Sequence, residues 1–298
     1  MSDGEGDFLQ SCITALRYLI DKKARLARAM WDQQHERSSP VSEFIKIKDT
    51  NGVRTIWMDR PAAKNAITHA MYTAIADTLL DAQTNKAVKV VVLTGAGDAF
   101  TAGNDLQDFM QTPPHLGGDE PRPVERFLRG ILEAEKILIA GVNGVAVGVG
   151  ATMLLHCDFV VAAKSAKISA PFVDLGLVPE AASSLLLPMV VGPRKAAQMF
   201  MLGTSISGEE AAECGLATSC VDDDVFEAEL MALAQTLAAK APTALRNTKM
   251  LLRKNTAAAA QRMAEEGALF AQGLKSPEFA EAAGAFMQKR PPDFSKFG

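Results

Sequence analysis

The stretch ILIAGVNGVAVGVGATMLLHCDFVVAA, residues 137–163, combines two apolar runs with a glycine-rich segment between them. Residues 137–142 have the β-branched, apolar character of a buried strand, and Asn143-Gly144 is a strong turn signal. The small residues that follow predict a tightly packed helix over 148–156, and residues 158–163 predict a second buried strand. A strand, a loop, a helix and a strand in this order indicate an α/β fold in which helices cover a sheet.

The same stretch has a second interpretation, a membrane span. Residues 137–155 are long and apolar enough to cross a bilayer, and Gly144 and Gly148 have the spacing of a helix-pairing motif. The Asn143-Gly144 turn, however, divides the run into a β-branched part and a Gly/Ala-rich part. A buried strand followed by a buried helix has the same hydropathy, so we expect no membrane span.

The alternation extends toward the N-terminus. Apolar and polar residues alternate with a period of two over residues 44–59, and Asn51-Gly52 lies in the middle of this segment. The pattern predicts two strands joined by a tight hairpin. The pattern then predicts a helix over 66–83, a buried strand over 88–95 and a helix over 124–136. Such alternation indicates repeated ββα or βα units with helices on a sheet.

Toward the C-terminus the chain is predicted to be mostly helical. Ser207 and Glu210 form a capping box, which predicts a helix over 208–214 that ends at Gly215. Four further helices are predicted over 222–240, 242–254, 257–273 and 276–290.

The first 40 residues differ from the rest. Apolar residues recur at helical spacing over 8–37, which predicts an amphipathic helix, and Pro40 with its preceding serines marks a linker. We expect this helix to dock on the core or on a neighbouring subunit. The predicted organisation is an N-terminal helical extension (1–40), a catalytic core (41–240) and a C-terminal helical region (241–298).

Composition excludes several classes of partner and cofactor. The formal net charge of −4, with both signs interspersed, provides no field that would attract nucleic acid. Cys12, Cys157, Cys214 and Cys220 form no Cys-x-x-Cys pair and have no histidine at metal-ligand spacing, so we expect reduced thiols and no metal site.

The two ends of the chain have no clear targeting signal. The first residues, MSDGEGD, are acidic, whereas secretory and transit peptides avoid acids at this point. The last four residues, Ser-Lys-Phe-Gly, differ from the peroxisomal Ser-Lys-Leu address. The cytoplasm is the default expectation, and mitochondrial or peroxisomal locations stay open.

Three loops that follow predicted strands carry small residues, through which a ligand could approach the backbone. They are DRPAAKNAIT (59–68), GDAFTAGNDL (97–106) and GVNGVAVGVG (141–150). None of them has a complete dinucleotide fingerprint or a phosphate-binding Gly-Lys-Ser/Thr sequence. Each loop alone is weak evidence for a site.

Taken together and in this order, the loops resemble the crotonase superfamily, the enoyl-CoA hydratases and isomerases, over about residues 41–290. The segments MDRPAAKNAIT, AFTAGNDL, GVNGVAVGVGATMLLHCDFVVAA and PFVDLGLVPEAASS are similar to the family motifs NRPxxxNAL, AFxAGxDL, VNGxAxGGGxxLxxxCDxxxA and PExxLGxxPxxGG. The resemblance implies a crotonase-like spiral of ββα units with a C-terminal trimerisation region, here with an extra N-terminal helix. It also implies homotrimers or dimers of trimers that bind an acyl thioester of coenzyme A.

The resemblance assigns roles to particular residues. The backbone N–H groups of Ala102 and Val149 match the oxyanion hole, which would hold the thioester oxygen; Val149 stands where most of the family has glycine. The residues implied in binding substrate or coenzyme A are Lys64, Ala66, Ala102, Gly103, Asn104, Asp105, Leu106, Phe286 and Lys289. Lys289 matches a position that often reaches across from another subunit.

The reaction is indicated by three further positions. The two glutamates with which the family's hydratases activate water fall on Thr152 and Phe172, and neither side chain accepts a proton at neutral pH. Glu180 stands where hydratases usually have glycine, and this combination resembles the Δ3,Δ2-enoyl-CoA isomerases, particularly the peroxisomal type. Apolar neighbours are expected to raise the pKa of Glu180 and make it a suitable general base.

Other interpretations stay open. On position alone, Glu180 is equally well explained as an acid that favours the N-terminal end of a helix. The chain could also be a crotonase-fold binding or interaction module without turnover, or catalyse another enoyl-CoA reaction such as hydration or thioester hydrolysis. In each case we expect no cofactor beyond the coenzyme A of the substrate.

Overall fold

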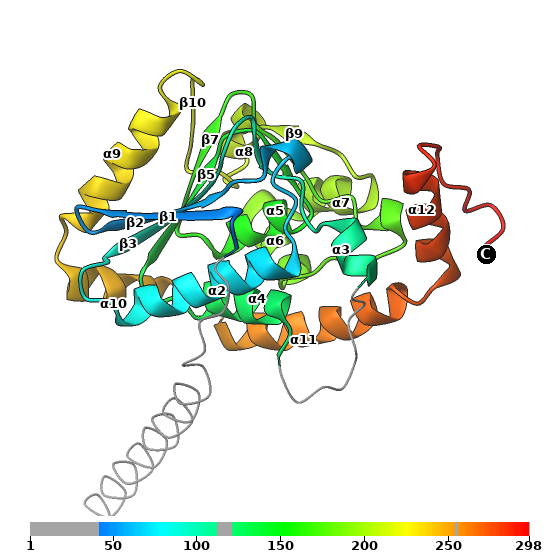
Figure 1. Ribbon diagram of the computed structural model, residues 1–298, viewed down its shortest axis with the longest axis horizontal. Coiled ribbons are helices and arrows are strands. Elements are labelled where there is room, and N and C mark those ends of the chain that lie inside the picture. The colour runs from blue at the N-terminus through cyan, green and yellow to red at the C-terminus, as the bar shows by residue number, and fades with distance from the viewer. Residues whose placement is uncertain (1–41, 112–120, 254–255, 298) are drawn as a thin grey trace, which may run out of the picture. The chain divides into compact units, whose positions relative to one another are not determined.

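A six-stranded, mostly parallel sheet forms the centre of the protein in the computed structural model, which describes residues 42–111, 121–253 and 256–297 (Figure 1). Its strand order is β1 (Ile45–Thr50), β2 (Val53–Met58), β3 (Val90–Gly95), β5 (Ile137–Val142), β7 (Phe159–Ala163) and β10 (Ser219–Val221). Only the β1–β2 pair is antiparallel. It is joined by Asn51 and Gly52 at φ 52° and 83°, as the hairpin signal predicted.

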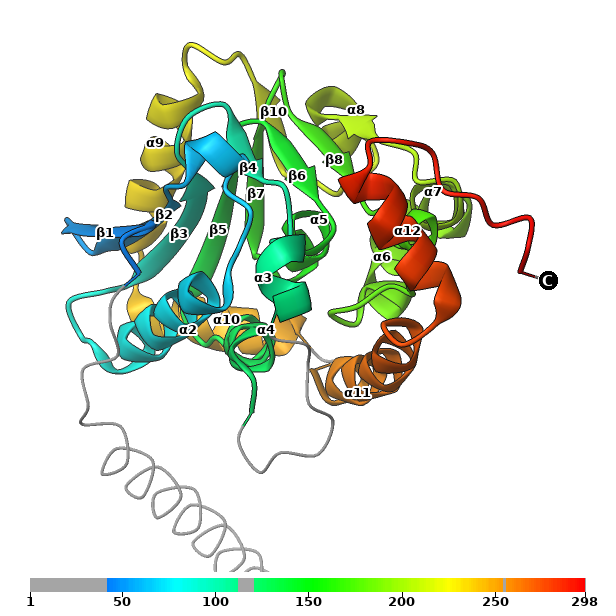
Figure 2. The same cartoon turned by 45° about the vertical axis from the view of Figure 1, so that its right-hand side comes forward.

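A second sheet of four short strands lies beside the first (Figure 2). It contains β4 (Ala99–Thr101), β6 (Val145–Val147), β8 (Lys167–Ser169) and β9 (Ile206–Ser207). The strands β4, β6 and β8 each follow a long strand, β3, β5 or β7, after a short turn. Each long strand therefore continues into a short one, and this repetition gives the ββ part of the predicted ββα units.

Helices cover both faces of the long sheet because its strands alternate apolar side chains between the faces. The helices α2 (His69–Thr84) and α4 (Pro123–Leu132) pack on the face that carries Ile56, Leu93 and Leu138. The opposite face, with Val92 and Ile139, is covered by α9 (Phe226–Ala238). The buried sheet explains why residues 137–142 are apolar without interruption.

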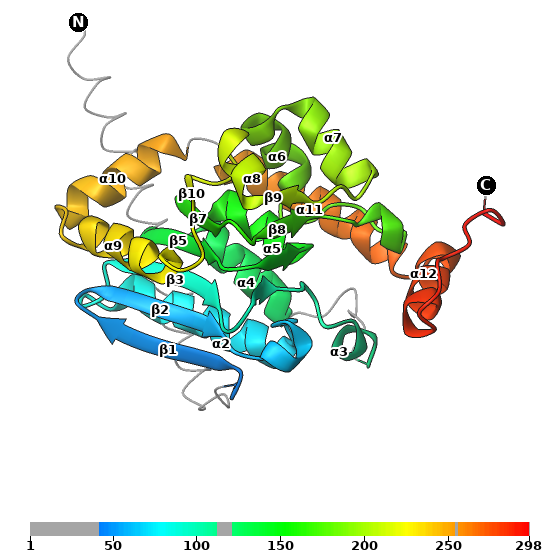
Figure 3. The ribbon, with the colours of Figure 1, turned by 90° about the horizontal axis from the view of Figure 1, so that it is seen from above.

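The remaining short elements connect these layers and position the loops. They are η1 (Pro61–Ala63), α3 (Leu106–Gln111), α5 (Val149–Thr152), η2 (Met153–His156), η3 (Val173–Leu175), α6 (Ser183–Val191), α7 (Pro193–Met201) and α8 (Gly208–Glu213). The C-terminal helices are α10 (Pro242–Leu252), α11 (Thr256–Gly273) and α12 (Pro277–Met287). Seen from above, α12 lies on the opposite side of the strands from α9 and α10 (Figure 3).

Most predicted elements are present, with differences at their ends. The predicted capping box is confirmed, since Ser207 Oγ accepts from the Glu210 N–H and Glu210 Oε2 accepts from the Ser207 N–H. The helix predicted over 148–156 is a single α-turn, α5, followed by the 3₁₀ helix η2. The short strands of the second sheet were not predicted, because two or three residues carry no readable periodicity.

The long apolar run folds as β5, β6, α5 and η2. Within the part of the chain that the structure describes, none of the helices is both long and apolar enough to span a bilayer. The amphipathic helix predicted over 8–37 lies outside the described residues.

Candidate active site

Glu180 lies between η3 and α6 and is only 8% exposed. Its side chain lines a cavity of about 600 Å³. The other lining residues are Asn104, Arg122, Val124, Glu125, Leu128, Arg129, Leu132, Glu133, Ala181, Ala260, Met263, Ala264, Gly267, Ala268, Phe270, Ala271 and Leu274. Most of them belong to α4 and α11, so two helices far apart in sequence form a largely apolar chamber in front of one carboxyl group.

Among the residues that the structure describes, one side chain donates a hydrogen bond to the carboxyl group of Glu180. Thr152, the last residue of α5, donates its hydroxyl hydrogen to Glu180 Oε1 at 3.1 Å. The pKa of Glu180 is raised to about 7, mainly by burial and also by the charge of Glu266, while the Thr152 hydrogen bond lowers it. At neutral pH this carboxyl group is therefore balanced between its acid and base forms, which suits proton transfer.

Asn104 enters the same cavity from the loop that follows β4. The phenol of Tyr72, on α2, donates to Asn104 Oδ1 at 2.5 Å. Burial, and after it the charge of Glu180, raises the pKa of Tyr72, so the phenol stays protonated and acts as a donor. Asn104 is therefore a residue of the cavity wall whose side-chain oxygen accepts from a buried phenol of α2.

The two loops predicted to form an oxyanion hole lie against each other. Gly103 has φ +90°, and a Cβ added there would lie 2.7 Å from Val147 O, so the loop after β4 lies close to the end of β6. Gly148 has φ 58° and ψ −118°, a conformation suited to glycine, and turns the chain into α5. The N–H group of Val149 is then the first of the helix, and within the described residues it has no acceptor.

The prediction for Ala102 requires a correction. Its backbone N–H donates to Lys64 O at 2.9 Å, because the loop of residues 59–68 lies alongside the loop after β4. An N–H group engaged in this way is not available to a substrate oxygen. Two residues further on, the N–H of Asn104 has no acceptor among the described residues, and it is the free donor of this loop.

Asn65 holds the two loops together, and sequence reasoning did not identify it. This fully buried residue donates from Nδ2 to Ala96 O at 2.9 Å and to Ala99 O at 2.7 Å. Its own carbonyl accepts from Thr101 Oγ1 at 2.7 Å. The available signal was the asparagine in the segment AAKNA, since a buried amide with several backbone partners fixes a loop.

Phe172, which the sequence resemblance matched to the second acid of the hydratases, lies in an aromatic cluster. Its ring is 6.3 Å from that of Phe200 and 6.5 Å from that of Phe270, and the side chain is 5% exposed. Phe270 also lines the Glu180 cavity. Through Phe270, the cluster therefore adds an apolar part to the wall of the cavity.

The remaining predicted binding residues do not line the cavity. Lys64 is exposed, with its ammonium group 3.9 Å from Asp98, and Ala66 and Leu106 are half-buried. Asp105 has a structural contact, since Oδ2 lies 2.5 Å from Arg60 Nη1 and Oδ1 accepts from the Asp108 N–H. Their predicted roles toward coenzyme A stay predictions.

The same applies to the two residues predicted near the C-terminus. Phe286 is 61% exposed on α12, and Lys289 is exposed just after that helix. The structure does not bring either of them to the cavity of the same chain.

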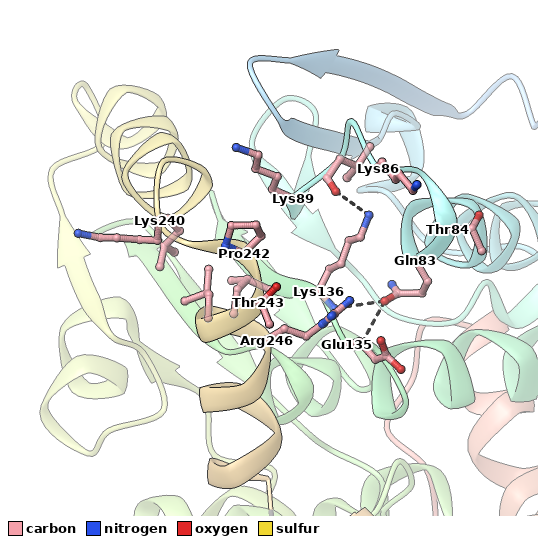
Figure 4. A pocket seen from close by; sticks show the side chains of 14 residues that line it. Gln83, Thr84, Lys86, Lys89, Glu135, Lys136, Lys240, Pro242, Thr243 and Arg246 are labelled. Atoms are coloured by element: carbon pink, nitrogen blue, oxygen red, sulfur yellow. Dashed lines mark hydrogen bonds between the residues drawn. The ribbon is translucent and has the colours of Figure 1, made fainter. Parts of the chain in front are cut away.

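A second cavity, of about 310 Å³, lies at the amino ends of β3 and β5 (Figure 4). It is lined by Lys86, Lys89, Lys136, Lys240 and Arg246, among others, but two of these ammonium groups bind the backbone. Lys136 Nζ donates to Asn85 O and Val88 O at 2.5 Å each, and Lys89 Nζ donates to Ala238 O at 3.1 Å. This cavity shares no lining residue with that of Glu180, whereas the loops of the candidate site follow the carboxyl ends of the same strands.

These features agree with a comparison against protein families. The model of the enoyl-CoA hydratase/isomerase family matches residues 48–296. Among solved structures, an enoyl-CoA hydratase/isomerase from Pseudoalteromonas atlantica superimposes with a TM-score of 0.81 and 43% sequence identity, covering 85% of this chain and 100% of that one. The predicted crotonase-like fold class is thereby confirmed, and the chain belongs to the enoyl-CoA hydratase/isomerase family.

Curated relatives carry more than one activity in their names. The chain is 34% identical to the 1,2-epoxyphenylacetyl-CoA isomerase of Escherichia coli, over 86% of this chain and 99% of that protein. It is 32% identical to the peroxisomal enoyl-CoA delta isomerase 3 of Mus musculus, over 84% of this chain and 80% of that protein. It is also 34% identical to the 2,3-dehydroadipyl-CoA hydratase of Escherichia coli, over 85% of this chain and 99% of that protein. The protein is thus an enzyme of this family, and its relatives include both isomerases and hydratases.

Proposed function

We propose that the protein is a Δ3,Δ2-enoyl-CoA isomerase, in which Glu180 moves a proton along the acyl chain of the substrate. The observation that carries this proposal is a single buried carboxyl group, with a pKa of about 7, at the wall of a largely apolar cavity. Relatives named enoyl-CoA delta isomerases support the same assignment.

The reaction requires one proton acceptor that becomes a donor. In a 3-enoyl-CoA, ionised Glu180 removes a proton from C2, next to the thioester, and the electrons move into a dienolate. The protonated carboxyl group then returns a proton to C4, which leaves the double bond conjugated between C2 and C3. A positioned general base contributes about two to four orders of magnitude in rate.

The dienolate oxygen needs donors that are already in place. We assign this role to the N–H groups of Val149 and Asn104, which are free in adjacent loops, while that of Ala102 is engaged with Lys64 O. Preorganised donors of this kind contribute about 3 kcal/mol each to stabilising the transition state. Val149 in place of a glycine supplies the same backbone donor, and its side chain is buried.

Coenzyme A enters as part of the substrate, and the proposed steps require no metal or redox cofactor. The nucleotide of coenzyme A is anionic, so a cation is expected beside it. We propose that the exposed Lys64, which lies next to the loop after β4, contacts the nucleotide bound to its own subunit. We further propose that the enzyme is a homotrimer, alone or paired, in which Phe286 and Lys289 contact the nucleotide bound to a neighbouring subunit. Their exposure on and beside α12, away from the cavity of their own chain, supports this arrangement.

Hydration is the competing reaction within the family, and the second-acid positions argue against it. Hydratases position water with two carboxylates, but this site presents a threonine hydroxyl and an aromatic cluster at the corresponding positions. With Glu180 as the buried carboxyl group of the cavity wall and no acid at either of these two positions, the proposed site can transfer a proton but does not present the pair of acids that orients a water molecule.

A paired assay on one preparation of the full chain tests this proposal. We expect the enzyme to convert 3-enoyl-CoA into trans-2-enoyl-CoA, and to hydrate crotonyl-CoA near the background rate. Strong hydration with weak isomerisation would make the protein a hydratase. Binding of acyl-CoA without either reaction would favour a non-catalytic module.

A further inference from the structure

The backbone that follows Glu180 adopts an unfavourable conformation. Ala181 and Ala182 have φ values of 61° and 56°, so two consecutive non-glycine residues are left-handed. In this region the Cβ of an L-residue crowds the neighbouring carbonyl, and such conformations persist only where surrounding contacts impose them. The turn decides where the Glu180 side chain points, so the contacts that impose it are relevant to catalysis.

Glu266, on α11, supplies two of these contacts from 84 and 82 residues away in sequence. Its Oε2 accepts from the Ala182 N–H at 2.6 Å, and its Oε1 accepts from the Ser184 N–H at 2.9 Å. The residue is only 5% exposed. A buried carboxylate that accepts two backbone hydrogen bonds in this way fixes both the turn and the start of α6.

The carbonyl side of the same turn is also held. His156 Nε2 lies 2.7 Å from Ala181 O, and because a carbonyl only accepts, Nε2 carries the hydrogen. Burial lowers the pKa of His156 to about 4, so the ring is neutral at physiological pH. Glu266 therefore holds the N–H groups of the turn, and His156 holds one of its carbonyls.

Helix α11 has a second role at the site, because it forms a wall of the acyl cavity. Met263, Gly267, Phe270 and Ala271 all line this cavity, and they flank Glu266 on both sides in sequence. Glu266 thus joins the wall of the cavity to the turn that carries the base.

We propose that Glu266 is a positioning residue for the isomerase reaction, which holds the left-handed turn and so aims the Glu180 carboxyl group into the cavity. This inference rests on the proposed function and adds to it a residue that does not touch the substrate. A buried contact far from the reacting atoms can act in this way, since a displacement of about 1 Å costs about a hundredfold in rate.

Charge gives Glu266 a second effect on Glu180. The groups that face this pair are Tyr72 from α2, Arg262 from α11 itself and the neutral His156 from η2. After burial, the charge of Glu266 is what raises the pKa of Glu180, while Thr152 lowers it. Removing that charge is therefore expected to lower the pKa of Glu180.

Glu266→Gln tests the inference, with Glu265→Gln as the matched control. Glu265 is the neighbouring acid on α11, but it is exposed and pairs with Arg262 at 3.0 Å. We expect Glu266→Gln to lower kcat by about tenfold to a hundredfold while KM changes less than about threefold. The acid limb of its kcat/KM against pH profile should move to lower pH, and Glu265→Gln should resemble the wild type.

A second variant separates positioning from folding. Adding Ala182→Gly to Glu266→Gln removes the cost of the left-handed residue, since glycine adopts this conformation readily. We expect the double variant to recover thermal stability but to stay slow, because glycine does not aim the turn. Recovery of kcat together with stability would reduce Glu266 to a purely structural role and overturn the inference.

The remaining outcomes are also decisive. A wild-type kcat and an unchanged acid limb in Glu266→Gln would overturn the inference. A parallel loss of kcat and rise of KM with no shift in the profile would indicate loss of α11 packing instead, and would overturn it as well. Titration of the Glu180 carboxyl group by ¹³C NMR gives the same pKa comparison without activity, so failure of the proposed reaction is distinguishable from failure of this inference.

Discussion

Thr152 donates a hydrogen bond to Glu180 across 3.1 Å, so a position that the sequence resemblance matched to a hydratase acid contacts the proposed base. A hydroxyl group in this place stabilises the ionised carboxylate and lowers the pKa of Glu180, against the larger effect of burial. With this hydroxyl group in contact with it, Glu180 is the buried carboxyl group of the cavity wall, and its pKa is about 7.

Removing that hydroxyl is expected to shift the pH dependence. In Thr152→Val the shape is retained and the donor is lost, so the pKa of Glu180 should rise above about 7. The acid limb of kcat/KM for 3-enoyl-CoA should then move to higher pH, while the rate at its alkaline plateau stays within about tenfold of the wild type. An acid limb that stays in place would show that this hydrogen bond does not act on the base.

The stability of the protein near the site should depend on pH through two groups with opposite signs. The folded-state pKa of Glu180, about 7, exceeds the ordinary value of 4.5 for a glutamate, so its contribution is present below pH 4.5 and is lost as pH rises to 7. The folded-state pKa of His156, about 4, is below the ordinary value of 6.5 for a histidine, so its contribution is present above pH 6.5 and is lost as pH falls to 4. Between pH 4.5 and 6.5 the two contributions to the free energy of unfolding change with pH in opposite directions, so their slopes nearly cancel in the wild type.

Single variants should expose each slope. Glu180→Gln keeps only the His156 contribution, so its free energy of unfolding should rise by about 3 kcal/mol from pH 4 to 6.5, relative to a group that does not titrate. His156→Gln should show the opposite trend, with a loss of similar size between pH 4.5 and 7. Urea denaturation at several pH values measures both, and equal slopes in the two variants would contradict the assignment.

Gly148 provides a test of the oxyanion loop. Its ideal Cβ would meet nothing within 4 Å, so Gly148→Ala acts through the backbone alone, at φ 58°. We expect a loss of about 1–3 kcal/mol in the free energy of unfolding, or a displaced Val149 N–H with kcat lowered by about a hundredfold. The matched control is Gly284→Ala in α12, also without a close neighbour, which should stabilise the protein by up to about 1 kcal/mol. Similar effects of both substitutions would show that the Gly148 conformation is unimportant.

The sequence predicted the fold well where the physical signal is local. Continuous apolar runs gave the buried strands β3, β5 and β7, and the Asn51-Gly52 pair gave the hairpin at the sheet edge. The short strands of the second sheet were missed because they depend on pairing between distant segments, such as β4 with β6 and β6 with β8.

At the site, sequence reasoning identified side chains better than it identified backbone groups. The lone acid in an apolar segment was a local signal, and its burial and raised pKa agree with the expectation for Glu180. Which N–H group is free cannot be derived from residue types, and Ala102 was therefore assigned a role that its bond to Lys64 O prevents. Glu266 gave no signal either, because its partners lie more than 80 residues away in sequence.

The most direct test of the central claim is Glu180→Gln, measured for isomerase turnover and for substrate binding on the same preparation. Glutamine keeps the size of the side chain and can still meet the Thr152 hydroxyl, but it cannot accept a proton from carbon. We expect kcat with 3-enoyl-CoA to fall by about two to four orders of magnitude, with the Kd for acyl-CoA from calorimetry within about threefold of the wild type. Turnover equal to that of the wild type would contradict the claim that Glu180 is the base.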